Sequence, residues 1–271
     1  MGRLRQFYDG TGVPLRIDRG QEVPAAAWTS HRTRLRSWLD SVPDAEWSGP
    51  TRCELWDITG LVRHLVSGSQ FLGYTLHKAR GGAATDLMRG FDTHLTVRAD
   101  AARFGEMAPQ VERETLAAKD ASIAAEIEDI DWSTKAEAPP GQLAAHLAVN
   151  HFLLDSWVHE YDMMRPRGEI PRVDPVEAQV VVSYVIGLAS LQAQSATGLD
   201  LRMGNPDFQV GVDIADETVL VTIGSAPKGA AVIEGDVVDF VDRTTGRKSG
   251  SVHGDQHGLA VIDCFGGLLA R

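Results

Sequence analysis

The segment 141–163 carries side chains whose types and spacing suit a divalent metal ion. His151, Asp155 and His159 follow one another at intervals of four residues, which places them on one face of a helix, one turn apart. An imidazole and a carboxylate on adjacent turns can bind one ion, but three ligands from consecutive turns of a straight helix diverge around its axis. Asp155 and His159 are therefore the predicted ligands, and His151 is predicted to line the pocket or to hydrogen-bond to a ligand.

A third candidate ligand lies in the segment 57–80. His64 stands near Leu61 and Leu65, on the side of a helix that is predicted to face other helices. Zinc bound by two imidazoles and one carboxylate keeps a fourth position open, which is typical of catalytic rather than structural sites. Spacing alone also allows hydrogen-bonded core histidines and a local ion pair, and these ligand types do not exclude other divalent metals.

Amphipathic helices are predicted to position these side chains. Pro109 interrupts the predicted helix at 97–129 and is expected to break or kink it. Polar segments connect the helices, and this organisation predicts a helical bundle. The predicted helices cover residues 24–41, 57–80, 97–129 and 141–163.

The pattern changes near residue 170, where strand-like segments begin. The predicted elements are a helix at 175–196, a hairpin of 208–216 and 218–224, a strand at 230–235, a helix at 236–243 and a final strand at 259–263. The predicted fold class is therefore α+β. An N-terminal four-helix bundle over residues 1–170 precedes a small α/β C-terminal lobe over residues 171–271.

Composition narrows the classes of partner. The chain has 271 residues and a net charge of −11, and this acidic balance disfavours binding to a nucleic-acid backbone. No apolar run is long enough to span a bilayer, and the N-terminus has no secretory pattern. Two cysteines outside any CxxC pattern favour a reducing compartment. We expect a soluble, cytoplasmic protein that binds neither nucleic acid nor membranes, and the sequence leaves a homodimer open.

Three motifs resemble a known family. They are TRCELWDI at 51–58 with LVRHL at 61–65, DSWVHEYDMMRPRG at 155–168, and IEGDVVDFVDRTTGR at 233–247. Together they are similar to the mycothiol-dependent maleylpyruvate isomerase-like proteins of the DinB-like superfamily. The resemblance covers both halves of the chain, and it implies a DinB-like metal-binding bundle.

Carried over by position, the resemblance implies zinc ligands at His64, Asp155 and His159, with mycothiol as the thiol cosubstrate. The family often has Glu at position 155, so the metal is expected closer to this helix or less tightly bound. Arg247 corresponds to an arginine that reaches the active site from the C-terminal lobe. Arg247 is therefore expected to be catalytic and to bind the cofactor, whereas without the resemblance it is interpreted as a solvated helix-end cation. His151, which the helix spacing places beside the predicted ligands, is also expected to contact the cofactor.

Other residues near these motifs have more than one interpretation. Cys53 is a candidate nucleophile, but no base is evident beside it, so we expect it to pack at the start of the helix. Asp162 either orients a ligand imidazole or caps the end of the bundle. Trp56 and Trp157 are expected to pack near the site.

The expected function is thiol transfer by a metalloenzyme. Zinc coordination deprotonates a thiol, and the thiolate would attack an electrophilic small-molecule substrate, as in an S-transferase. A cis–trans isomerase of a maleylpyruvate-like acid and a zinc-dependent hydrolase are alternatives. Transfer is preferred over isomerisation. A dicarboxylate substrate has two anionic groups, and Arg247 is the one strong anion-binding candidate in the sequence. A non-catalytic metal- or thiol-binding protein, with His151 as a fourth ligand, is less favoured.

Overall fold

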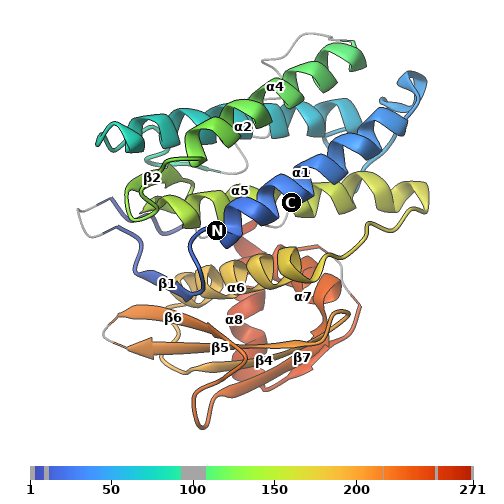
Figure 1. Cartoon of the computed structure of the whole chain (residues 1–271). Coiled ribbons are helices and arrows are strands. Elements are labelled where there is room, and N and C mark those ends of the chain that lie inside the picture. The colour runs from blue at the N-terminus through green and yellow to red at the C-terminus, as the bar shows by residue number, and fades with distance from the viewer. Residues whose placement is uncertain (1–3, 9–11, 93–107, 216, 248–249, 270–271) are drawn as a thin grey trace. The chain divides into compact units, whose positions relative to one another are not determined.

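The computed structural model describes residues 4–8, 12–92, 108–215, 217–247 and 250–269 (Figure 1). The chain forms two compact units, one of residues 24–172 and one that joins residues 1–23 to residues 173–271. The N-terminal segment thus clusters with the C-terminal residues, whereas the sequence-based ranges placed it with the bundle. The fold class is α+β, as predicted.

The helical unit is built on long helices. α2 packs against α4 and α5, and leucines of α1, α2 and α4 form a buried apolar core. Two short 3-10 turns, Asp44–Glu46 and Arg165–Arg167, flank the helices. The helices are α1 (Val23–Ser41), α2 (Ile58–Arg80), α4 (Pro109–Ile127) and α5 (Ala145–Met164).

Local signals explain where these helices begin. The Asp57 side chain accepts a hydrogen bond from the Gly60 N–H at 2.8 Å. Asp57 is therefore the N-cap of α2, as predicted. Pro109 does not interrupt a helix, because it occupies the first turn of α4, where its missing N–H has no cost. Most of the predicted helix that precedes it, residues 97–107, lies outside the described residues.

A small hairpin precedes α5, where the prediction began the helix at residue 141. Strands β2 (Lys135–Ala138) and β3 (Gly141–Ala144) pair in an antiparallel ladder. Pro139 and Pro140 form the turn between them, together with Gly141, whose φ is 116°. The breaker sequence therefore reverses the chain, and the helix starts four residues later than predicted.

The α/β unit contains a mixed sheet of six strands among the described residues, in the order β1-β6-β5-β4-β7-β8. β1 pairs with β6 and β4 pairs with β7 in parallel, and the other neighbouring strands are antiparallel. The strands are β1 (Leu15–Asp18), β4 (Leu199–Gly204), β5 (Phe208–Ala215), β6 (Thr218–Ile223), β7 (Ala231–Asp236) and β8 (Val252–Gly254).

Helices α6 (Pro175–Gln192), α7 (Val237–Thr244) and α8 (Gln256–Leu269) complete this unit. α6 contacts α7 and α8. Gly187 of α6 lies against Leu15 and Val221, and Gly258 of α8 lies against Ile233 and Leu199. These sheet residues belong to one face, so α6 and α8 cover the same side of the sheet.

The predicted hairpin of β5 and β6, the strand β7 and the helix α7 are confirmed. The predicted final strand at 259–263 is wrong, because these residues lie inside α8. Its buried residues Val261, Ile262 and Phe265 follow a helical period, which a run of five residues is too short to distinguish from a strand. Among the described residues, no helix has both the length and the hydropathy that a membrane-spanning segment requires.

Candidate metal centre

The three predicted ligands converge between α2 and α5. Nε2 of His64 lies 3.2 Å from Oδ2 of Asp155, and Nε2 of His159 lies 3.4 Å from Oδ1 of Asp155. One ligand atom from each residue can be chosen so that all lie within 4.8 Å of one another. Ligand atoms about 2.1 Å from a tetrahedral zinc ion are about 3.4 Å apart. The donor set and its spacing therefore fit a divalent ion.

The orientation of His159 also fits a ligand. Nδ1 of His159 donates a hydrogen bond to Oδ2 of Asp162 at 2.9 Å. This bond directs Nε2 of the ring toward Asp155 and His64. Ligand imidazoles usually donate their other N–H to such a carboxylate, which fixes the tautomer and the ring orientation.

Aromatic contacts restrict the second imidazole. The His64 ring stacks on Trp56 with centroids 4.9 Å apart and planes inclined by 28°. The His64 and His159 rings meet edge to face at 5.0 Å. Trp56 is 8% exposed, so it forms a fixed wall beside the ligands, and the predicted packing role of Trp56 agrees with this position.

A second group of potential ligands, Cys53, His159 and Asp162, lies beside the first. Sγ of Cys53 lies 3.3 Å from Oδ2 of Asp162 and 4.0 Å from Nδ1 of His159. Nε of Arg52, however, lies 2.9 Å from Oδ1 of Asp162. A cation at this distance repels a metal ion. The arrangement of this second group therefore suits the support of His159 better than it suits a second metal site.

The charges of the first group are strongly coupled. Burial alone would raise the pKa of Asp155, but the His64 and His159 imidazoles hold it well below its usual value. Burial alone would lower the pKa of His159, but Asp155, Asp162 and Cys53 raise it well above the usual value. Without a metal, Asp155 is therefore ionised and His159 holds a proton that a metal ion must displace.

His151 is not in either group of potential ligands found among the described residues. Its ring meets Phe152 edge to face at 5.5 Å. Burial lowers the pKa of His151 to about 4, against the opposing effect of Asp155. His151 is therefore neutral at physiological pH, and its predicted contact with a cofactor stays a prediction.

Arg247 belongs to the other compact unit. It follows α7, where its N–H donates to the Asp242 carbonyl at 2.7 Å and its guanidinium donates to the Thr245 carbonyl at 3.1 Å. The Asp242 bond closes the C-terminus of the helix. The catalytic role of Arg247 toward the metal group stays a prediction.

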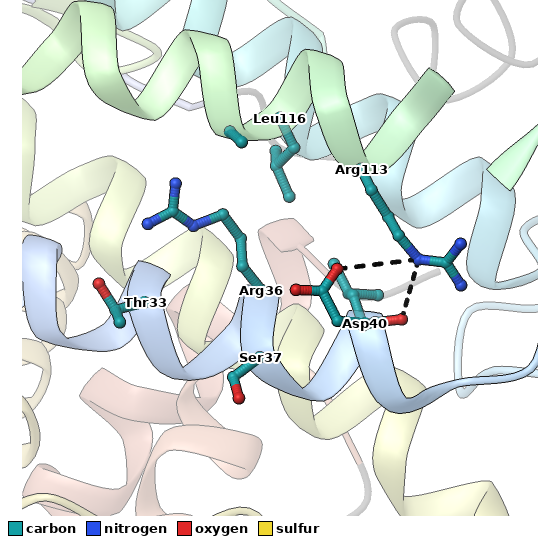
Figure 2. Close-up of a pocket in the computed structure, with 8 residues that line it drawn as sticks. Thr33, Arg36, Ser37, Asp40, Arg113 and Leu116 are labelled. Atoms are coloured by element: carbon teal, nitrogen blue, oxygen red, sulfur yellow. Dashed lines mark hydrogen bonds and ion pairs between the residues drawn. The ribbon is translucent and has the colours of Figure 1, made fainter. Parts of the chain in front are cut away.

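A pocket of about 410 Å³ lies elsewhere in the helical unit, between α1 and α4 (Figure 2). Its two arginines face carboxylates, since Arg113 lies 2.8 Å from Asp44 and Arg36 lies 3.6 Å from Asp120. None of the predicted ligands lines this pocket. It is therefore separate from the candidate metal centre.

Sequence reasoning missed Arg52 as part of the site. Arg52 stands within the motif at 51–58, but its partner Asp162 is 110 residues away. The position of Asp162 three residues after His159 allows two roles, support of a ligand imidazole or a cap at the end of the bundle, and the structure places it against His159. No local pattern connects that carboxylate to the loop before α2.

A bundle that brings two imidazoles and a carboxylate together, on a chain that also carries an α/β unit, defines a class of proteins with a candidate metal centre in the bundle. The family model described as the mycothiol maleylpyruvate isomerase N-terminal domain matches residues 28–164, and the chain belongs to this family. The match contains α2, α4, α5 and all three predicted ligands.

Solved structures share the fold across both units. A crystal structure of mycothiol-dependent maleylpyruvate isomerase, a histidine-to-alanine mutant, is 17% identical, with a TM-score of 0.61. A second crystal structure of mycothiol-dependent maleylpyruvate isomerase is 18% identical, with a TM-score of 0.57. Each alignment covers 89% of this chain and 95% of the other chain. No curated protein matches the chain.

Proposed function

We propose that this protein is a mycothiol-dependent metalloenzyme of the thiol S-transferase type. His64, Asp155 and His159 would hold one divalent metal ion, with zinc as the preferred ion. A zinc ion bound there supplies a Lewis acid that keeps a thiol ionised at neutral pH. The substrates would be a small thiol and an electrophilic small molecule.

The observation that carries the proposal is the separation of the ligand atoms. The distances of 3.2 Å and 3.4 Å from Asp155 to the two imidazoles match those around a tetrahedral ion. The membership of the chain in the mycothiol maleylpyruvate isomerase family supports mycothiol as the thiol. Three protein ligands leave a fourth position for that thiol.

The ligand set also favours an anionic partner at that position. Asp155 is ionised and contributes one negative charge, whereas the two neutral imidazoles of a ligand set contribute none. A divalent ion therefore keeps one excess positive charge. This charge would attract the thiolate form of the cosubstrate rather than the thiol.

We assign Arg247 and His151 to substrate binding within this proposal. Arg247 would hold an anionic group of the thiol or of the second substrate in a charge-assisted hydrogen bond. The neutral His151 would offer a hydrogen bond to the thiol cosubstrate. The assignment of Arg247 follows from the family resemblance of the motif at 233–247, and that of His151 follows from its position one helical turn before Asp155.

Elemental analysis tests the metal centre. We expect about one zinc ion per native chain, as the three-ligand site requires. The double variant His64→Ala, His159→Ala should lose the metal while its circular dichroism remains helical. Equal, negligible metal in both proteins after purification with added metal would contradict the proposal.

Assays with mycothiol then separate the reactions. The preferred function predicts that a mycothiol conjugate of the electrophile accumulates. Recovery of free mycothiol with an isomerised acid would instead identify a cis–trans isomerase. This second candidate is supported by the names of the family and of both solved structures. Turnover of esters or amides without thiol would identify a hydrolase.

A further inference from the structure

We infer that Asp162 is a positioning residue that holds His159 in the orientation needed for metal binding, and that Arg52 in turn fixes Asp162. This inference rests on the proposed function, since it concerns a ligand of the proposed metal centre. It assigns a task to a carboxylate and a loop that do not themselves bind the ion.

The first step is the burial of Asp162. Its side chain is 0% exposed, so its charge must be matched by hydrogen-bond donors. Oδ2 accepts from Nδ1 of His159 at 2.9 Å and from Sγ of Cys53 at 3.3 Å. Oδ1 accepts from Nε of Arg52 at 2.9 Å. The carboxylate is therefore held at both oxygens.

The second step is the tautomer of His159. A metal ion needs the lone pair of Nε2, so the ring proton must lie on Nδ1. The Asp162 carboxylate accepts hydrogen bonds and has no proton to donate, which favours the Nδ1–H tautomer. The bond also limits rotation of the ring, and Nε2 stays aimed at Asp155.

The third step is the role of the loop at 51–57. The Arg52 N–H donates to the Asp162 carbonyl at 3.0 Å, in addition to the ion pair between the side chains. Main-chain and side-chain contacts thus fix the loop on the end of α5. The Arg52 guanidinium also balances the charge of Asp162, so this carboxylate orients His159 without adding net negative charge beside the ion.

Metal affinity tests the inference. Asp162→Asn keeps the shape of the side chain but removes its charge and one acceptor. We expect zinc affinity, measured by competition with a chromophoric chelator, to fall about 10- to 100-fold. The visible absorption of bound Co²⁺ should also change, because His159 no longer has a fixed orientation.

Asp120→Asn is the matched control. Asp120 is another buried carboxylate of the helical unit, 6% exposed and paired with Arg32 at 3.0 Å, but it is in neither group of potential ligands. Its zinc affinity and Co²⁺ spectrum should equal those of the native protein. Equal losses in both variants would overturn the inference, because the effect would then come from any lost buried charge.

Arg52→Met tests the same connection from the loop. It should weaken zinc binding less than Asp162→Asn, and the two effects should not add in the double variant, because Arg52 acts through Asp162. If Asp162→Asn does not fold, Arg52→Met decides alone, and native affinity in this variant overturns the inference.

The outcomes also separate this inference from the proposed function. Native affinity and spectrum in Asp162→Asn, with binding still lost in His64→Ala, would overturn the positioning role and leave the metal centre intact. Failure of the native protein to bind zinc or Co²⁺ would overturn the metal centre itself.

Discussion

At the scale of single residues, His159 connects the metal centre to pH. Its Nε2 faces Asp155 and its Nδ1 faces Asp162, at 3.4 Å and 2.9 Å. Both carboxylates stabilise a protonated ring in the absence of metal. The contacts that orient His159 for a metal ion therefore also favour a protonated ring, so a proton competes with the metal ion for Nε2.

This competition predicts how metal affinity depends on pH. The pKa of His159 in the metal-free protein lies well above the usual value, so zinc displaces a proton from this ring at any pH below that raised pKa. Affinity should rise with pH in this range, by up to tenfold per pH unit for one proton. Calorimetry at pH 7 in buffers with different ionisation enthalpies should show about one proton released per zinc. Release that stays near zero at pH 7 would contradict the raised pKa of His159.

Sequence patterns indicated which potential ligands come together better than they indicated the contacts that support them. Asp155 and His159 share one face of α5, and His64 lies on the apolar side of α2. Helix periodicity is local information, so the sequence alone indicates both placements. The contact of Arg52 with Asp162 joins a loop to a helix 110 residues later. No spacing rule specifies such a contact, because it depends on how the helices pack.

At the scale of elements, a buried polar network joins the helices of the bundle. Arg32 of α1 is 1% exposed. Its guanidinium donates to Asp120 of α4, Ser156 of α5 and Ser69 of α2, at 3.0, 2.8 and 3.1 Å. One side chain thus contacts the three other helices, and this network sets how α1 lies against the helices that carry the ligands.

Removing this guanidinium should destabilise the bundle. Arg32→Met leaves the buried Asp120 with a weaker partner, Arg36 at 3.6 Å. We expect the free energy of unfolding, measured in urea, to fall by about 3–5 kcal/mol. Arg36→Met is the matched control, because Arg36 is 32% exposed and pairs with the same carboxylate. Its loss should be below about 1 kcal/mol, and equal losses would contradict the importance of burial.

Elements with local signals were predictable, and elements defined by distant partners were not. Asp57 marks the start of α2 and Asp236 caps α7. β1 is an edge strand of four residues whose partner β6 lies about 200 residues later, so its sequence alone gives little indication of pairing. The segment 259–263 is helical although its pattern predicts a strand, because short apolar runs occur in both helices and strands.

At the scale of the whole molecule, the chain leaves one compact unit and later returns to it. The helical unit is a single stretch of residues 24–172, whereas the α/β unit combines both ends of the described chain. All three predicted ligands lie in the uninterrupted unit. Changes in β1 should therefore affect the α/β unit and spare the metal centre.

Leu15 provides the test. It is 4% exposed, pairs with Val219 and lies against Gly187 of α6. Leu15→Ala should cost about 2–5 kcal/mol, and hydrogen exchange should accelerate in β5 and β6 while zinc content stays the same. Ile17→Ala, at a less buried position of the same strand, should have a smaller effect. Faster exchange confined to α2 and α5 would contradict this independence.

The return of the chain to the α/β unit has a consequence for synthesis on the ribosome. β1 leaves the exit tunnel first, yet its partner β6 follows about 200 residues later, which takes roughly 10–40 s at usual elongation rates. During that interval the whole helical unit emerges and can fold, while β1 has no partner strand to pair with. The helical unit, with its candidate metal centre, can therefore fold before β1 has its partner strand.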